Sequence, residues 1–195
     1  IVKWYVEVFD ANFETKPEKD KKENETALVA IATILTMVQK KQNTFVEMTS
    51  EKINDLLSKL NPEDKPKWGI MTPQHMVEHL EYTYKIAAGE IQDFEVSTPE
   101  KILEKVHASL YNYEKFPKNT KFPTLEKDKL EELKHADLNT AVEKFKAQRK
   151  KYIEYFKENP ESRLNNMVFG EMNRYEWYLL ERKHLNHHFE QFGLL

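Results

Sequence analysis

The stretch His184-Leu185-Asn186-His187-His188 decides how this sequence folds, and it lies within a long helical pattern that runs from Gly170 to Phe192. An α-helix places residues four apart on one face, so His184 and His188 point to the same side, one turn apart. Two imidazoles in this arrangement are typical ligands of a single metal ion. The spacing therefore predicts part of a metal site, whose third ligand must come from another segment.

A second pair of histidines four apart, His75 and His79, lies in TPQHMVEHL, residues 72–80. Thr72 suits an N-cap and Pro73 suits the first helical position, which predicts a helix from Thr72 to about Gln92. The inward stripe of this helix includes His79, with Met76, Leu80, Thr83, Ile86 and Ala87. A lone helical histidine is more often a packed or solvated residue than a ligand. If the two helices are neighbours, however, three imidazoles can meet at one ion.

Length and composition indicate a folded, helix-rich chain. Its 195 residues are enough for one domain, or for one domain with an appendage. Hydrophobic residues make up 39% and aromatic residues 12%, which excludes a disordered chain. The near balance of 30 basic and 33 acidic residues argues against nucleic acid as a partner. With only 4 glycines, an α-rich fold is favoured.

Neither a membrane span nor a secretion signal is expected, because there is no apolar run of about 18 residues and no signal-peptide layout. The sequence has no cysteine, which excludes disulfides, thiolate metal sites and a cysteine nucleophile. This composition fits a reducing cytoplasm. Since the chain begins with Ile1 rather than Met, we expect a fragment of a longer protein or a processed product.

Two runs rich in β-branched residues, Ile1 to Phe9 and Thr26 to Val38, flank the polar stretch from Asn12 to Glu25. They predict a β-hairpin over residues 1–41 with a long loop. The second run also suits a buried helix, because it contains Ala, Leu and Met. Two strands alone are marginal in water, and their apolar edges invite pairing. We therefore expect the hairpin to pack on the helices or to join two copies in a homodimer.

The remaining residues predict helices joined by loops. Four main helices with one or more longer connections indicate a mainly α fold, a four-helix bundle. The expected helices are Ser50 to Leu60, Thr72 to Gln92, Thr98 to Tyr113, a long one between the cap Asp137 and Asn159, and Gly170 to Phe192. Expected loops are Phe116 to Leu125 and Glu161 to Phe169. Aromatic residues expected in the core are Tyr82, Tyr84, Trp177, Phe189 and Phe192. The basic run from Lys144 to Lys151 is expected to be a solvated face.

Two motifs resemble the DinB/YfiT-like superfamily. WGIMTPQHMVEHL, residues 68–80, is similar to the start of that family's metal-carrying second helix. FGEMNRYEWYLLERKHLNHHFEQFG, residues 169–193, is similar to its closing helix, in which His-x-x-His-His is followed by Gln. The resemblance covers about residues 49–195 and implies an up-down-down-up four-helix bundle. It also implies that His79, His184 and His188 bind a metal ion.

By the same resemblance, His75 and His187 are not ligands. His187 would support a ligand or cap the helix, and His75 would line the mouth of a pocket. Three neutral imidazoles leave an open position for water, and Zn²⁺ or Ni²⁺ there would lower the pKa of that water. The second nitrogen of each imidazole needs an acceptor, for which Glu78, Glu181, Asn173 or a tyrosine is available. Glu90 and Glu181 are the carboxylates to consider as general base, although a surface charge is the simpler expectation for each.

IVKWYVEVFDAN, residues 1–12, and ETALVAIATILTMVQKK, residues 25–41, resemble the last two strands of a MaoC-like hot-dog domain. Such domains occur in enoyl-CoA hydratases and in ring-opening enzymes of phenylacetate catabolism. Because only the closing hairpin is matched, the resemblance implies no hydratase activity here. It implies a parent protein in which a hot-dog domain is fused to a DinB-like bundle.

The expected function is that of a divalent-metal-binding domain acting on a small-molecule substrate. It would be a metal-dependent hydrolase or a thiol-dependent transferase in a protein related to CoA-thioester or phenylacetate catabolism. The alternative is a non-catalytic accessory or assembly bundle attached to a MaoC-like enzyme. A general base near the metal would distinguish the two, because a scaffold needs none.

Overall fold

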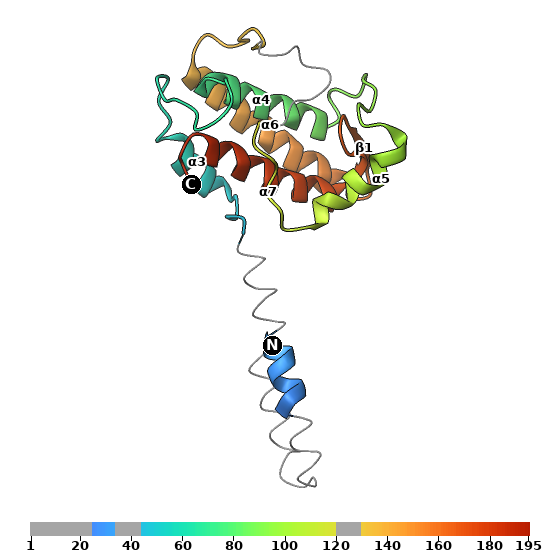
Figure 1. The fold of residues 1–195 in the computed structure, drawn as a ribbon. Helices are drawn as coiled ribbons and strands as arrows, with labels where there is room; N and C mark the ends of the chain where they lie inside the picture. The colour runs from blue at the N-terminus through green and yellow to red at the C-terminus, as the bar shows by residue number, and fades with distance from the viewer. Residues whose placement is uncertain (1–24, 34–43, 120–129) are drawn as a thin grey trace. The chain divides into compact units, whose positions relative to one another are not determined.

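A computed structural model describes residues 25–33, 44–119 and 130–195 of this chain. These residues are mainly helical, with one two-stranded antiparallel sheet (Figure 1). The chain divides into two units, Ile1–Thr44 and Phe45–Leu195, and each is described by itself. Within the described ranges, none of the helices combines the length and the apolar character that a membrane span requires.

In the first unit, residues 25–33 form a helix, so the predicted strand from Thr26 to Val38 is wrong over 26–33. The Thr33 hydroxyl donates to the carbonyl oxygen of Val29, one turn earlier, at 2.8 Å. This local bond lets a threonine be accommodated in a helix. Val29 and Ile31 are exposed, which also differs from the buried helix weighed as an alternative. The rest of the predicted hairpin, residues 1–24 and 34–41, lies outside the described residues.

Three long helices organise the second unit: α4 (Pro73–Ala87), α6 (Leu138–Glu158) and α7 (Arg174–Gln191). The predicted caps are confirmed, since the Thr72 side chain accepts from the His75 amide and Asp137 accepts from the Thr140 amide. Helices α4 and α6 pack along each other, and both end beside the small sheet, so they run in the same direction (Figure 1). Helix α7 starts at that sheet and returns the opposite way.

The shorter helices are α3 (Ser50–Leu57), α5 (Glu100–Ala108) and the 3₁₀ turn η1 (Ser109–Tyr111). Helix α3 begins one residue after its cap, Thr49, whose side chain accepts from the Lys52 amide. Helix α4 ends earlier than the predicted Gln92. The reason is Gly89, whose φ of +74° belongs to the left-handed region that stops helices.

The sheet pairs β1 (Arg163–Asn166) with β2 (Gly170–Asn173), where a loop and the start of the last helix were predicted. In the turn, the Asn166 side chain accepts from the amides of Val168 and Phe169, at 2.9 and 3.1 Å. Gly170 then takes a φ of +71°. A reciprocal capping box between Asn173 and Glu176 delays the start of α7 to Arg174.

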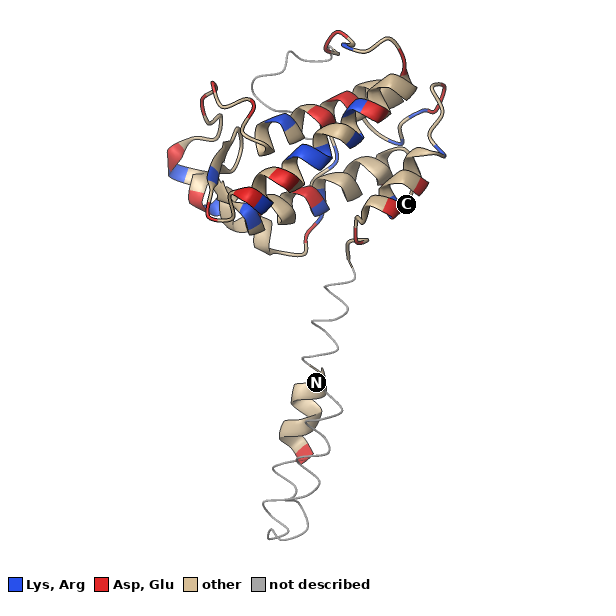
Figure 2. Cartoon of the chain, turned by 180° about the vertical axis from the view of Figure 1, so that it is seen from behind, with Lys and Arg blue, Asp and Glu red and all other residues tan. Residues whose placement is uncertain are grey.

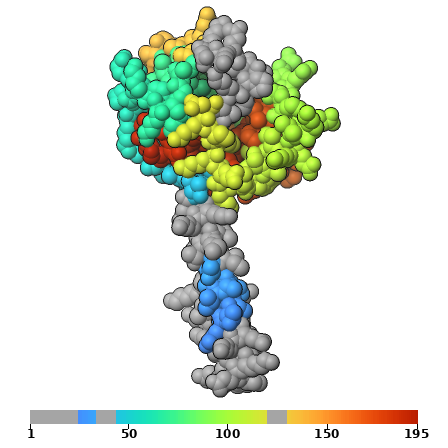
Figure 3. Space-filling model, in the orientation of Figure 1, coloured from blue at the N-terminus to red at the C-terminus, as the bar shows by residue number. Residues whose placement is uncertain are grey.

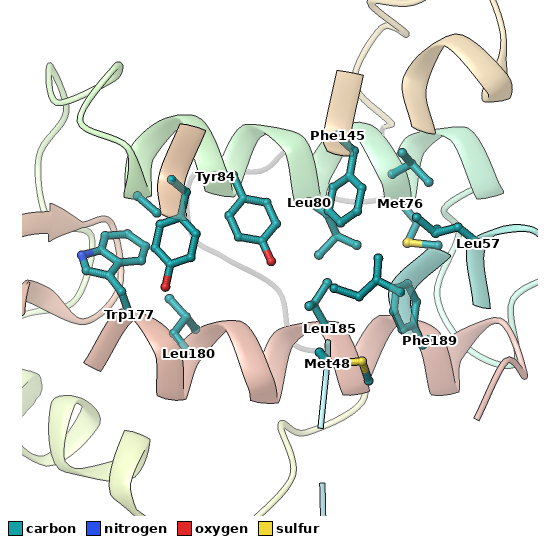
Figure 4. Close-up of a cluster of buried hydrophobic side chains, with 14 of the residues drawn as sticks. Met48, Leu57, Met76, Leu80, Tyr84, Phe145, Trp177, Leu180, Leu185 and Phe189 are labelled. Atoms are coloured by element: carbon teal, nitrogen blue, oxygen red, sulfur yellow. The ribbon is translucent and has the colours of Figure 1, made fainter. Parts of the chain in front are cut away.

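The core lies between α4, α6 and α7 and continues to α3. Figure 4 shows its apolar side chains filling the space between α4 and α7, among them Leu80, Leu185 and Phe189. Of the aromatic residues predicted to be core, four are buried, whereas Tyr82 is half-buried. Burial of this apolar surface is the main force that holds the helices together.

The segment after η1 crosses α7, and Figure 3 shows its yellow atoms in front of that helix. It is fixed by Lys183, a buried residue of α7 whose ammonium donates to the Ser109 carbonyl and the Asn112 side chain, both at 2.7 Å. A third bond, to the Glu114 carbonyl, is 3.1 Å long. Of the predicted crossing loop from Phe116 to Leu125, residues 116–119 are described and the rest are not.

Acidic and basic residues are interspersed along the helices in Figure 2, in keeping with the small net charge of −3. The expected solvated face of α6 is confirmed for Lys144, Lys150 and Lys151, which are exposed. Arg149 is the exception, because its side chain retains only 13% exposure and forms an ion pair within the fold.

Candidate metal centre

The three histidines predicted to be ligands come together between α4 and α7. The Nε2 atom of His184 lies 2.9 Å from Nε2 of His79 and 3.0 Å from Nε2 of His188. All three potential ligand atoms lie within 4.8 Å of one another. Nitrogens bound to one tetrahedral Zn²⁺ at about 2.0–2.1 Å would be roughly 3.3 Å apart. The two separations of 2.9 and 3.0 Å would therefore have to widen slightly for the three side chains to hold a divalent ion.

Gln191 fixes the tautomer of His188. Its amide Nε2 donates to the carbonyl oxygen of Trp68 at 2.8 Å, so its Oε1 must face the other way. That oxygen lies 2.9 Å from Nδ1 of His188 and can only accept a hydrogen bond. Nδ1 therefore carries the proton, which leaves the lone pair of Nε2 free for a metal ion. A partner of this kind orients a metal-bound imidazole and strengthens its binding.

Gly69 helps to hold this arrangement. Its φ of +76° is one that side chains other than glycine rarely adopt, and a Cβ there would lie 3.0 Å from Nε2 of Gln191. The conformation of Gly69 thus lets the carbonyl group of Trp68 approach α7 and accept the hydrogen bond from Gln191. Sequence reasoning noted a glutamine after the histidines but gave it no role.

Burial keeps the three imidazoles neutral. It lowers the pKa of His79 to about 4, with a smaller contribution from the charge of His187. Burial also holds the pKa values of His184 and His188 well below their ordinary value, and neighbouring histidines lower them further. Protons therefore compete little with a metal ion for these nitrogens at neutral pH.

The two other histidines of the motifs lie off the site. The ring of His187 meets the rings of Trp68 and His188 edge-on, with centroids 5.4 and 5.1 Å apart, so it packs against a ligand. His75 is held by the Thr72 hydroxyl at 2.6 Å and the Glu131 carbonyl at 3.1 Å. It lines neither of the two hollows described below.

The acceptors predicted for the imidazoles are engaged elsewhere. Glu78 accepts from the backbone amides of Lys134 and His135, and Asn173 caps α7. Glu181 accepts from Arg149 and from the Tyr84 hydroxyl. The predicted assignment of these residues to the ligand nitrogens is wrong, and the structure gives that role to Gln191 for His188.

Glu181 is not the surface charge expected from the sequence, because its side chain is only 9% exposed. One carboxylate oxygen accepts from Arg149 Nε at 2.7 Å and from the Tyr84 hydroxyl at 2.8 Å. The same guanidinium also donates to the Ser50 hydroxyl and the Met48 carbonyl. Glu90, in contrast, is exposed as expected and pairs with Lys151.

We expect Glu181→Ala to destabilise the fold by about 3–5 kcal/mol, because it leaves the buried guanidinium of Arg149 without its carboxylate. Urea unfolding followed by circular dichroism measures this loss. Glu143→Ala is the matched control, because Glu143 is exposed on α6 and its ion pair with Lys146 should contribute only about 0–1 kcal/mol. Equal losses in the two variants would show that the Glu181 pair is no stronger than a surface pair.

A cavity of about 10 Å³ adjoins His184, and its surface is mainly apolar, although Glu181, Thr83, Tyr84 and Tyr152 are among the residues that line it. Its volume is close to what a single water molecule requires. Glu181 precedes His184 by almost one helical turn, so both residues face this cavity. The site thus combines three neutral imidazoles with an adjacent carboxylate.

Comparisons of this chain with models of known protein families, with curated proteins and with solved structures found no match. The DinB-like and MaoC-like resemblances therefore stay predictions from the motifs. A function has to be argued from the chemistry of the site.

Replacing Gln191 tests the tautomer argument. Gln191→Met keeps the size of the side chain but removes the acceptor for His188 Nδ1, and we expect metal affinity to fall by about 10–100-fold. Competition with a coloured chelator measures the change. Gln191→Glu keeps an acceptor oxygen at the same place and should restore most of the affinity. If Met and Glu variants bind metal equally well, the tautomer of His188 is not set by residue 191.

Proposed function

We propose that residues 49–195 form a DinB-like four-helix bundle that binds one Zn²⁺ or Ni²⁺ ion through His79, His184 and His188. In this proposal α3, α4, α6 and α7 are the four helices, in up-down-down-up order. The parallel course of α4 and α6 and the reversed course of α7 support this order. The most direct support for metal binding is the convergence of the three Nε2 atoms.

We further propose that the bound ion serves catalysis, in a hydrolase or a thiol-dependent transferase. A divalent ion held by three imidazoles supplies a Lewis acid with an open position that can take water or a thiolate. Among the residues that the structure describes, the ligand cluster includes no fourth His, Asp or Glu. Structural metal sites are usually closed by a fourth protein ligand. The open position therefore favours catalysis over a purely structural role.

The side chains around the small cavity suit such chemistry. Glu181 is a carboxylate placed beside His184, and Tyr84 and Arg149 hold it in position. A carboxylate so placed can accept a proton from a water molecule, and the cavity has room for no more than one. The Tyr84 hydroxyl donates to Glu181, and burial raises the pKa of Tyr84 well above its usual value. Tyr84 therefore acts as a hydrogen-bond donor and stays protonated.

Metal analysis of protein purified without an affinity tag tests the first proposal, and the metal-loaded protein is then assayed. Activated esters probe hydrolysis, and a small thiol with an electrophile probes transfer. We expect one activity that requires the metal and is lost in Glu181→Gln, which keeps the shape of the side chain. Metal without either activity would favour an accessory bundle. Protein without bound metal, even after incubation with Zn²⁺ or Ni²⁺, would contradict the proposal.

A further inference from the structure

A second hollow, of about 740 Å³, lies between α6 and the first half of α7. We name it the α6–α7 groove; its lining includes Arg149, Tyr152, Arg174, Tyr175, Tyr178 and Glu181. Hollows of about 300–1,000 Å³ are typical of small-molecule sites. We propose that this groove binds a small carboxylate with a flat apolar body, such as an aromatic acid.

The charge for recognising a carboxylate comes from Arg174. Three arginines line the groove, and two of them are already paired: Arg149 with Glu181 at 2.7 Å, and Arg163 with Glu171 at 2.5 Å. Within the described ranges, Arg174 has no ion pair or hydrogen bond from its side chain. A guanidinium binds a carboxylate through two parallel hydrogen bonds, which makes it the natural anchor for such a ligand.

Arg174 also stands at a favourable place. It is the first residue of α7, at the end of the helix where the backbone dipole is positive. Its charge reaches Tyr152 on the opposite wall: burial raises the pKa of that phenol, and Arg174 opposes the rise. The positive charge of Arg174 is therefore felt inside the groove, at Tyr152, as well as at the surface.

The flat apolar surface comes from tyrosines. The rings of Tyr175 and Tyr178 are stacked, with centroids 6.2 Å apart and planes at 27°. Tyr175 is 58% exposed, which is a large exposure for an aromatic side chain next to an unpaired arginine. Ile153 and Phe156 line the α6 side. A planar ring can lie against these side chains while its carboxylate reaches Arg174.

The groove disfavours ligands with several negative charges. Glu161 also lines it and is exposed, so a di- or triphosphate would meet a like charge. The charges of Arg149 and Arg163 are balanced by their partners, Glu181 and Glu171. Of the charged residues that line the groove, Arg174 and Glu161 are left, with opposite signs. This balance suits a monocarboxylate.

The groove is separate from the metal centre but borders it. Tyr152 and Glu181 line both the groove and the small cavity beside His184, whereas none of the three ligand histidines lines the groove. Binding in the groove does not require a metal ion. The groove proposal therefore stands or falls independently of the proposed catalysis.

Calorimetric titration of the full chain with benzoate tests the proposal, with acetate and benzyl alcohol as probes that lack the ring or the charge. We expect benzoate to bind at least roughly tenfold more tightly than either, since a charge-assisted bidentate bond and a stacked ring both contribute. Arg174→Gln should weaken benzoate about tenfold or more and leave the metal content unchanged. Lys144→Gln, an exposed change on α6 outside the groove lining, should leave benzoate binding unchanged.

Three outcomes would overturn the proposal. Benzoate binding that is absent, or that Arg174→Gln leaves intact, would remove Arg174 as the anchor. Equal binding of benzyl alcohol would show an apolar groove with no role for charge. Loss of benzoate binding on chelation or in His184→Ala would place the carboxylate on the metal ion. Circular dichroism of each variant confirms that the fold is retained.

Discussion

Replacing His184 with Ala will abolish stoichiometric metal binding, from about one ion per chain to a trace. His184 is the central ligand, because its Nε2 lies within 3.0 Å of the Nε2 atoms of both His79 and His188. Without it, two imidazoles on different helices remain, which is too few for a stable site. Mass-spectrometric metal analysis of tag-free protein measures the result.

His75→Ala is the matched control, since His75 lies on the same helix as a ligand but bonds to Thr72 and Glu131 instead. It should keep its full metal content. A His184→Ala protein that is folded by circular dichroism and still holds one ion per chain would rule out the three-histidine site.

Removing the metal with a chelator should lower the melting temperature by about 8–16 °C. An ion present at about 1,000 times its dissociation constant stabilises the folded state by about 4 kcal/mol. For a domain of this size, each kcal/mol corresponds to about 2–4 °C. Differential scanning calorimetry with and without chelator at neutral pH gives the shift. Acidification should reduce the same stabilisation, because protonated imidazoles do not bind metal.

His184→Ala is the control for this experiment too, and its melting temperature should not respond to chelator. If protein shown to contain metal melts at the same temperature after chelation, the apolar core alone holds the helices. The ion would then contribute nothing to the fold, although it could still serve chemistry.

Local patterns in the sequence were enough to predict that three long helices exist and that His79, His184 and His188 lie close together. Thr72 and Asp137 act as caps as predicted, because N-cap bonds involve residues only three apart. The histidine site followed from i,i+4 spacing on one helix and an inward stripe on another. The inward stripe favoured His79, and the resemblance of the two motifs to the DinB/YfiT-like superfamily implied the same residue rather than His75.

Long-range partners were not predictable. Glu181 was expected at the surface because Arg149, 32 residues away, gave no sign that it would turn inward. The sheet was missed because its strands have only four residues each. The capping box of Asn173 and Glu176 was visible in the sequence and would have corrected the start of α7. At residues 26–33, β-branched content favoured a strand, although the segment is helical.

The buried ammonium of Lys183 restricts access to the three histidines from one side. The segment that it fixes cannot swing away from α7 without leaving that charge among apolar side chains with none of its three acceptors. Lys183 immediately precedes His184, so the crossing segment is fixed close to the histidine cluster. In the proposed function, an ion or a reactant would therefore have to enter from another side of α7, and catalysis would not use the crossing segment as a lid.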